Sequence, residues 1–200
     1  EIIEVANEFS ERFSKKFNLK IFKTASEAGL KIIMFGLESC SKKVLEAMNK
    51  NISLRYVTKN LQQAKENNII TAVFLIFGFP AETLNDAVIT HNFMLDLKNS
   101  IDICICNEFY LEVGRFIYFN PSKFNIKNIY GDKKYFIGPN CKFVKTASQK
   151  NQYNPLEYTK MFLNDVKNDF LSYPELAVYS FPKLLTANNK FIHKILKKTN

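Results

Sequence analysis

Two stretches of the chain, residues 32–37 and 71–77, are almost continuously apolar, and a third at residues 101–108 alternates apolar with polar positions. Stretches this short and this apolar are typical of strands buried on both faces. Between the first two, apolar residues recur with helical spacing and predict a helix with one buried stripe: Leu54, Val57, Leu61 and Ala64. The alternation of strands with helices predicts parallel strands joined by right-handed βαβ units.

Capping residues mark the ends of three further helices. A helix over residues 19–28 is expected to end at Gly29, because glycine readily adopts the left-handed conformation that closes a helix. Ser41 can cap a short helix that runs through Met48. The third helix covers residues 84–98, and its apolar side is expected to consist of four residues: Leu84, Val88, His91 and Leu95.

The predicted strands end near positions 37, 77 and 109, which lie 40 and 32 residues apart along the chain. This is the normal pitch of a TIM-type barrel or of a doubly wound sheet, and the pattern alone leaves both open. Residues 121–155 are rich in Gly, Pro, Asn and Lys and are expected to be irregular. Pro155 then opens a helix to about residue 171, and a second apolar and aromatic stretch follows.

The composition excludes a disordered chain, since 46% of the residues are hydrophobic and 14% are aromatic. The net charge of +9 is uneven: residues 1–100 carry 13 Lys and Arg against 11 Asp and Glu, and residues 101–200 carry 15 against 8. A basic half can hold RNA or a phosphorylated substrate. Only three of the 28 basic residues are arginines, however, and nucleic-acid grooves favour arginine, so we do not favour a nucleic-acid partner.

Cysteine usage and hydropathy suggest the compartment. The four cysteines, at positions 40, 104, 106 and 141, contain no CxxC pair, so neither a zinc site nor a redox pair is indicated. Cys104 and Cys106 fall on one face of a predicted strand and are interpreted as buried apolar residues. No apolar stretch approaches the roughly 20 residues of a membrane helix. We therefore expect a soluble, reduced, cytoplasmic segment of a longer protein, with no membrane span and no metal ligands.

The first cluster with chemical potential is residues 36–39 (GLES), at the carboxyl end of the first strand. Ligands of parallel α/β folds bind at this edge of the sheet. Glu38 can accept paired hydrogen bonds from a ribose diol, and Ser39 can add a contact. Glu38 can equally be a negative charge placed near the N-terminus of the next helix, and both interpretations stay open.

The second cluster is residues 77–83 (FGFPAET), at the carboxyl end of the next strand. Gly78 permits a backbone path and a close ligand approach that a side chain would block. The alternative is a strand-to-helix turn with good capping, in which Glu82 and Thr83 occupy a helix N-terminus.

Several motifs in order resemble the radical SAM superfamily, in particular the branch shared by methylthiotransferase-like enzymes and by enzymes with a cobalamin-binding domain. These motifs are residues 28–31 (AGLK), 35–39 (FGLES), 44–50 (VLEAMNK) and 76–83 (IFGFPAET). The resemblance covers about residues 13–121. It implies that residues 1–121 form the carboxyl-terminal half of a partial (βα) barrel with parallel strands. Residues 122–200 would form an irregular and helical extension.

The resemblance also implies roles for individual residues. Glu38 would contact the ribose of S-adenosylmethionine, beside Gly36 and Ser39. The backbone around Phe77, Gly78 and Phe79 would border its adenine. Two positions depart from the family pattern, since Cys40 and Ala81 each replace a glycine.

The superfamily binds its [4Fe–4S] cluster through a CxxxCxxC loop, and no such spacing occurs in these 200 residues. The resemblance therefore implies a fragment of a radical SAM enzyme whose cluster ligands lie upstream, in a missing N-terminal half of the barrel. Such enzymes generate a 5′-deoxyadenosyl radical or transfer a methyl-type group to a substrate, which is unknown here, and some use cobalamin. Two alternatives are a degenerate nucleoside-binding relative without cluster chemistry and a basic RNA-binding accessory domain.

Five other polar residues are weaker candidates. His91 and His193 lack metal-binding partners at useful spacing and are interpreted as structural. Glu108 and Glu112 flank the third strand end, where a solvated or ion-paired role competes with substrate contact. Arg115 lies beside them and could grip a carboxylate or phosphate.

Overall fold

The computed structural model describes residues 19–130, 140–145, 153–167, 169 and 171–172. Their centre is a parallel four-stranded sheet in the order β1-β2-β3-β7. The strands are β1 (Ile32–Glu38), β2 (Ile70–Phe77), β3 (Ile103–Glu108) and β7 (Leu171–Ser172). The prediction of three adjacent parallel strands is thus confirmed, as is the mixed α/β fold of a partial barrel.

The strand register brings the three carboxyl ends to one edge of the sheet. Glu38 lies opposite Leu75 near the end of β2, and Phe77 lies opposite Glu108 at the end of β3. The loops that follow these strands therefore start side by side. This is the edge at which parallel α/β folds bind ligands.

Helices cover one face of the sheet, where their buried residues share one core with the strands. They are α2 (Leu19–Glu27), α4 (Leu54–Glu66), α5 (Leu84–Asp96) and α7 (Pro155–Val166). The apolar residues of α4 meet alternate residues of the strands in one core, which includes Phe22, Phe35, Leu61, Leu75, Phe77 and Phe162. The predicted stripe of α4 is confirmed, since Val57, Leu61 and Ala64 are fully buried.

The opposite face of the sheet is also apolar but less completely buried. A smaller cluster there consists of Ile70, Ala72, Ile103 and Ile105. Ile32, Met34 and Phe74 pack against this cluster and are only partly buried. Because strand side chains alternate between faces, this second face is the one that a closed barrel would turn inward.

The predicted helix ends are confirmed. Gly29 has a φ of +96°, and the Leu30 amide donates to the Ala25 carbonyl at 2.9 Å, which closes α2 in a Schellman motif. Ser41 caps α3 (Lys42–Ala47) by accepting a hydrogen bond from the Val44 amide. None of the helices in the described part of the chain is long and apolar enough to cross a membrane.

The predicted buried side of α5 is wrong for Leu84 and Val88, whereas Leu95 packs against the core as predicted. Leu84 and Val88 are exposed, whereas the buried residues are Asp86, Ala87, Thr90 and Met94. Polar residues occupy this side because they complete the preceding turns. The Thr90 hydroxyl accepts from the Cys40 amide at 3.0 Å, and Ser41 Oγ donates to Asp86 Oδ1 at 2.7 Å. Hydrogen bonds rather than apolar spacing therefore fix the rotation of this helix.

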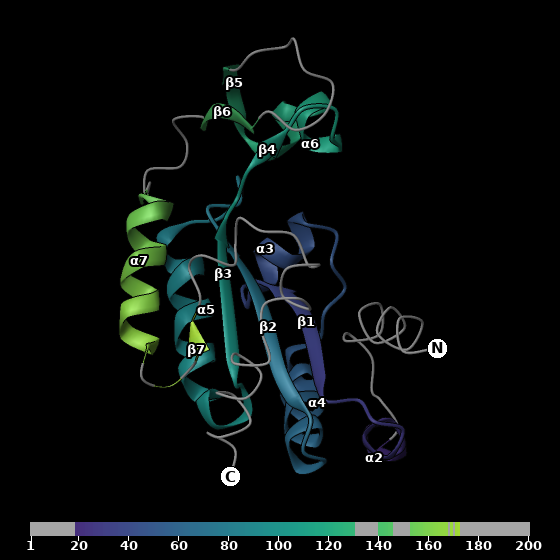
Figure 1. The fold of residues 1–200 in the computed structure, drawn as a ribbon. Coiled ribbons are helices and arrows are strands. Elements are labelled where there is room, and N and C mark those ends of the chain that lie inside the picture. The colour runs from purple at the N-terminus through teal and green to yellow at the C-terminus, as the bar shows by residue number, and fades with distance from the viewer. Residues whose placement is uncertain (1–18, 131–139, 146–152, 168, 170, 173–200) are drawn as a thin grey trace.

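The segment after β3 is more regular than predicted. It forms a small antiparallel sheet in the order β4-β6-β5, which lies beyond the carboxyl ends of the large sheet in Figure 1. The elements after β3 are β4 (Leu111–Glu112), α6 (Phe116–Phe119), η2 (Pro121–Phe124), β5 (Ile126–Tyr130) and β6 (Asn140–Lys145), whereas η1 (Lys98–Ser100) precedes β3. The expectation of an irregular segment over 121–155 is therefore wrong for β5 and β6. Exposed positions dominate β5, so it lacks the apolar pattern by which buried strands are recognised.

Beyond this small sheet the chain returns to the large one. The helix predicted from Pro155 is confirmed but ends at Val166 rather than near residue 171. β7 then pairs with β3 in parallel, with Ile103 opposite Leu171. The division at residue 121 stays a prediction, although the large sheet itself continues past it. The apolar stretch predicted after residue 173 lies outside the described residues.

Candidate functional site

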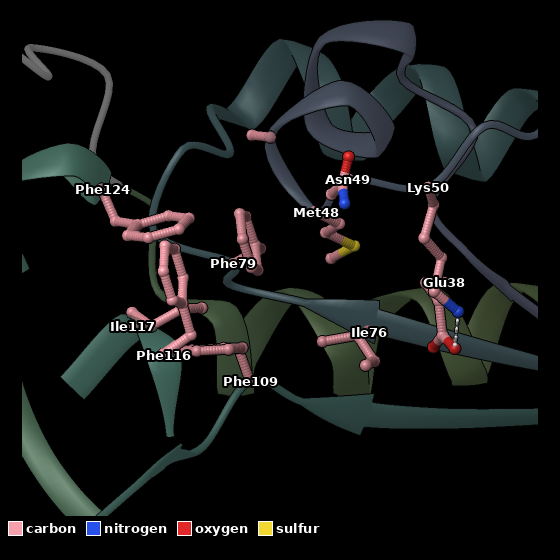
Figure 2. A pocket seen from close by; sticks show the side chains of 11 residues that line it. Glu38, Met48, Asn49, Lys50, Ile76, Phe79, Phe109, Phe116, Ile117 and Phe124 are labelled. Carbon is pink, nitrogen blue, oxygen red and sulfur yellow. Dashed lines mark hydrogen bonds and ion pairs between the residues drawn. The ribbon is translucent and has the colours of Figure 1, made fainter. Parts of the chain in front are cut away.

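A pocket of about 670 Å³ opens at the carboxyl ends of β1, β2 and β3. Figure 2 shows two different ends, with Glu38 and Lys50 on one side and aromatic rings on the other. The lining residues are Glu38, Ala47, Met48, Asn49, Lys50, Ile76, Phe79, Phe109, Phe116, Ile117 and Phe124. Predominantly apolar walls with a few polar groups are typical of small-molecule sites.

Glu38 enters the pocket from an unusual backbone turn. Its φ is +65°, and the Ser39 amide donates to the Leu37 carbonyl at 2.8 Å, which makes Glu38 the centre of a three-residue γ-turn. The pairing of β1 with β2 becomes irregular between Gly36 and Glu38. A residue with a side chain at positive φ costs about 1–3 kcal/mol, and such residues cluster at functional sites. The positive φ therefore makes Glu38 a candidate for a functional residue.

Lys50 pairs with Glu38 inside the pocket. Lys50 Nζ lies 2.7 Å from Glu38 Oε1 and also donates to the Gly36 carbonyl at 3.4 Å. The side chain of Glu38 is 16% exposed and that of Lys50 is 38% exposed, so the pair is partly shielded from water. A Cβ atom on Gly36 would lie 3.0 Å from Glu38 Oε1, so glycine leaves the room that the carboxylate occupies.

The C-terminus of α3 places Lys50. Asn49 adopts a φ of +56°, and the Lys50 amide donates to the Leu45 carbonyl at 2.8 Å. This is a Schellman motif with asparagine in the left-handed position. It turns the chain sharply after α3, and Lys50 extends back over the end of β1.

The other end of the pocket is an aromatic cluster drawn from three separate segments. Phe79 follows β2, Phe109 follows β3, and Phe116 and Phe124 belong to α6 and η2. The Phe79 ring lies 5.2 Å from Phe109 and 6.0 Å from Phe124, both edge to face. Phe79 is buried under the cluster, whereas Phe116 is 63% exposed at its rim. The cluster offers flat apolar surface to a ring-bearing ligand.

A buried hydrogen-bond network holds the turn that carries Phe79. Gly78 has a φ of +85°, and its amide donates to the Glu82 carboxylate and, at 3.1 Å, to the Tyr153 hydroxyl. Tyr153 in turn donates its hydroxyl proton to Glu82. Burial and the neighbouring Glu82 charge raise the pKa of Tyr153 well above its ordinary value, so the hydroxyl stays protonated.

The structure brings only part of the predicted site together. Glu38 and Phe79 line the pocket, and Gly36 borders it through its carbonyl. Ser39 is instead fully buried, with its hydroxyl 3.2 Å from that of Thr90 on α5.

Phe77 and Gly78 also lie behind the pocket wall. Phe77 points into the helix-covered core, where its ring lies 5.4 Å from Phe162. Gly78 contributes backbone alone, and Pro155 lies on its open side. Of the three residues that the resemblance places around the adenine, only Phe79 therefore lines this pocket, and Phe77 and Gly78 pack behind it.

Lys50 and the aromatic residues beyond β3 were missed by the sequence reasoning. Lys50 lies in the segment 44–50 that carries part of the family resemblance, and the helix-ending Asn49 was the available signal. Tyr153 has no local signal, because it reaches Gly78 across 75 residues of sequence.

The weaker candidates lie away from the polar end. Arg115 Nε donates to Glu112 at 2.6 Å in an exposed ion pair. The His91 ring packs 5.0 Å from Phe162, consistent with a structural role, and burial lowers the pKa of His91 although the Asp165 charge opposes this. His193 lies outside the described residues.

The three cysteine side chains that the structure describes do not fit an iron–sulfur cluster. Cys40, Cys104 and Cys106 are buried, and Cys104 Sγ lies 3.5 Å from Cys106 Sγ. Burial raises the pKa of Cys40 and Cys106, whereas cluster ligands are thiolates. Within the described ranges, no group of three His, Cys, Asp or Glu side chains is arranged to hold a metal ion.

Comparisons with known proteins found one family model and one curated relative that match part of the chain. The family model described as the radical SAM superfamily matches residues 7–94. An uncharacterized methyltransferase of Pyrococcus horikoshii is 32% identical over 77 residues, which are 38% of this chain and 17% of that protein. The chain thus matches less than a fifth of the length of this curated relative.

Two solved structures align with part of the chain. Coproporphyrinogen III oxidase (HemN) from Escherichia coli, a radical SAM enzyme, aligns with a TM-score of 0.52 and 14% identity, over 78% of this chain and 31% of its own. The radical S-adenosylmethionine methyltransferase TsrM from Kitasatospora setae aligns with a TM-score of 0.43 and 14% identity, over 55% of this chain and 24% of its own.

Proposed function

Since this chain belongs to the radical SAM superfamily, we propose that its pocket binds S-adenosylmethionine in a radical SAM enzyme. When bound at a [4Fe–4S] cluster, this cofactor supplies a 5′-deoxyadenosyl radical or a methyl-type group. The observation that carries the proposal is Glu38, whose strained turn places a carboxylate inside the pocket.

The Glu38 carboxylate suits a ribose diol. An ionised carboxylate accepts two hydrogen bonds from neighbouring hydroxyls, and charge-assisted bonds of this kind are stronger than neutral ones. Lys50 holds Oε1 at 2.7 Å and so fixes the orientation of the carboxylate before any ligand arrives. An oriented acceptor avoids part of the ordering cost of binding.

The aromatic cluster suits the adenine ring. Phe79 and Phe109 provide apolar surface at the opposite end of the pocket from Glu38, as Figure 2 shows. A purine stacked or packed edge-on against such rings gains about 0.5–1.5 kcal/mol beyond the burial of its area. The pocket thus has a polar end for the ribose and an apolar end for the base.

The cluster ligands must come from elsewhere in the protein, because the described thiols do not fit a cluster. We propose that an N-terminal half of the barrel supplies them and packs on the incompletely buried face of the sheet. Two observations support this: among the described residues β1 lies at one edge of the sheet, and Ile32, Met34 and Phe74 are only partly buried. Further strands can pair with the backbone of such an edge strand and cover the apolar residues beside it.

The proposed reaction outcome is transfer of a methyl-type group, in the branch of methylthiotransferase-like and cobalamin-associated enzymes. The 77-residue match to a protein named as a methyltransferase supports this outcome. A cobalamin cofactor rests on the resemblance of the sequence motifs alone and stays a prediction, as does a cytoplasmic location. The substrate is not specified by these residues.

Calorimetric titration of S-adenosylmethionine into the whole protein that carries this chain tests the proposal. We expect Glu38→Gln to weaken binding about ten- to a hundredfold, because charge-assisted bonds are lost. Glu27→Gln is the matched control, since Glu27 is an exposed glutamate on α2 whose side chain is 65% exposed. Equal affinities of wild type and Glu38→Gln would contradict the proposal.

A cofactor-cleavage assay on the same whole protein distinguishes an enzyme from a relative that only binds the nucleoside. After anaerobic reconstitution with iron and sulfide, and with dithionite added as the electron donor, the enzyme is expected to cleave the cofactor reductively. Cofactor binding without cleavage would favour the nucleoside-binding relative instead. Binding of RNA that falls steeply with salt, without cofactor binding, would favour the basic accessory domain.

A further inference from the structure

The segment that precedes α7 lies directly on the turn that carries Phe79. Tyr153 hydrogen-bonds both the Gly78 amide and the Glu82 carboxylate, across 75 and 71 residues of sequence. A Cβ atom on Gly78 would lie 2.7 Å from side-chain atoms of Pro155, so the proline ring packs on Gly78 without room for another side chain. The turn at the end of β2 is therefore built from two distant parts of the chain.

The Tyr153 hydroxyl links the segment before α7 to the turn after β2. It accepts from the Gly78 amide and donates to Glu82, which is only 2% exposed. The Tyr153 hydroxyl and the Gly78 amide both donate to Glu82 Oε2, so loss of the hydroxyl removes one donor from this buried carboxylate. The hydroxyl thereby supports the left-handed φ of +85° at Gly78, which sets the direction of Phe79 into the pocket.

We infer that Tyr153 is a positioning residue for the cofactor site, acting through the Gly78 turn on Phe79. This inference rests on the proposed function, since it takes the pocket to be the S-adenosylmethionine site. Tyr153 does not line the pocket. Its effect on the cofactor passes through the geometry of the turn.

Tyr158 provides a matched comparison within the same core. Its ring lies 5.3 Å from those of Tyr153 and Phe77, so it shares the surroundings of Tyr153. Its buried hydroxyl has no hydrogen-bond partner among the described residues, and it makes no bond to the Gly78 turn. Removing this hydroxyl tests the effect of losing a buried oxygen without disturbing the turn.

The experiment compares Tyr153→Phe, Tyr158→Phe and Glu38→Gln in the whole protein by two measurements. The first is hydrogen–deuterium exchange of the amides of residues 77–83 without cofactor. The second is the dissociation constant for S-adenosylmethionine. For Tyr153→Phe we expect faster exchange in this segment and binding weakened about three- to tenfold, the usual effect of one lost hydrogen bond. For Tyr158→Phe we expect neither change.

The outcomes separate this inference from the proposed function. Unchanged exchange at residues 77–83 in Tyr153→Phe would overturn the inference. Faster exchange with unchanged affinity would also overturn it, provided that Glu38→Gln still weakens binding, and would leave the proposed function intact. An equal loss of affinity in Tyr158→Phe would show a general packing effect and overturn the positioning role. A wild-type protein that binds no cofactor would overturn the proposed function and this inference together.

Discussion

Lys50 Nζ lies 2.7 Å from Glu38 Oε1, although 12 residues and the helix α3 separate them in sequence. Two residues with a left-handed backbone make this contact possible: Glu38 has a φ of +65°, and Asn49, which precedes Lys50, has a φ of +56°. The first turns the carboxylate into the pocket, and the second returns the chain so that Lys50 reaches it. The backbone conformation on both sides of α3 therefore brings the two residues of this ion pair together.

The first prediction concerns this ion pair. Lys50→Met should lower the free energy of unfolding by no more than about 1 kcal/mol, because the lysine is partly exposed. It should nevertheless weaken S-adenosylmethionine binding, since Glu38 loses the group that orients it. Urea denaturation and calorimetric titration measure the two effects. Lys42→Met is the control, because Lys42 is an exposed lysine whose side chain is 90% exposed. A similar effect of both variants on affinity would contradict the orienting role.

The second prediction concerns the strain at Glu38. Glu38→Ala and Glu38→Gly both remove the carboxylate, but only alanine retains the cost of a positive φ. We expect the glycine variant to be more stable than the alanine variant by about 1 kcal/mol, with cofactor binding weak in both. Urea denaturation measures this difference. Equal stabilities would mean that the turn relaxes and that no strain is stored there.

The sequence predicted the strands and both turns because their signals are local. Residues 32–37 and 71–77 are apolar without interruption by charge, and the turns at Glu38 and Gly78 follow them directly. The rotation of α5 could not be predicted in this way. Its buried side depends on hydrogen bonds from Thr90 to a turn 50 residues earlier.

The remaining site residues depend on similarly distant contacts. Phe116 and Phe124 join Phe79 only because the chain folds back beyond β3, and their own segment shows no periodic pattern. Tyr153 reaches Gly78 from a segment that was expected to be irregular. Lys50 is the exception, because the left-handed Asn49 that places it is a recognisable helix end.

The third prediction uses two glycines with nearly the same backbone. Gly78 and Gly114 have φ values of +85° and +83°. A Cβ atom would meet Pro155 at 2.7 Å in the first and nothing within 4 Å in the second. Both Gly→Ala variants should lose stability from the positive φ, and Gly78→Ala should lose more because of the clash. Thermal or urea unfolding that ranked them in the opposite order would contradict the packing of Pro155 on the turn.

The fourth prediction concerns pH. Burial raises the pKa of Asp86, but hydrogen bonds from Thr83, Ser41 and Lys43 outweigh it, so the net pKa is lowered. A carboxyl whose folded pKa is lowered stabilises the fold above its unfolded pKa of about 3.9, and this stability is lost as pH falls through the folded value. Wild type should therefore exceed Asp86→Asn in stability at pH 7, and the difference should shrink below about pH 4. A difference that stayed constant from pH 7 to pH 3 would contradict this.

The central claim is that Glu38 accepts hydrogen bonds from the ribose of S-adenosylmethionine. A cycle of two proteins and two ligands tests it most directly: wild type and Glu38→Gln, each titrated with the cofactor and with its 2′-deoxy analogue. If the carboxylate binds the diol, the missing hydroxyl should cost wild type about 1.5–3 kcal/mol of binding free energy and cost Glu38→Gln much less. Equal losses in the two proteins would mean that the hydroxyl and the carboxylate act independently, and would contradict the account.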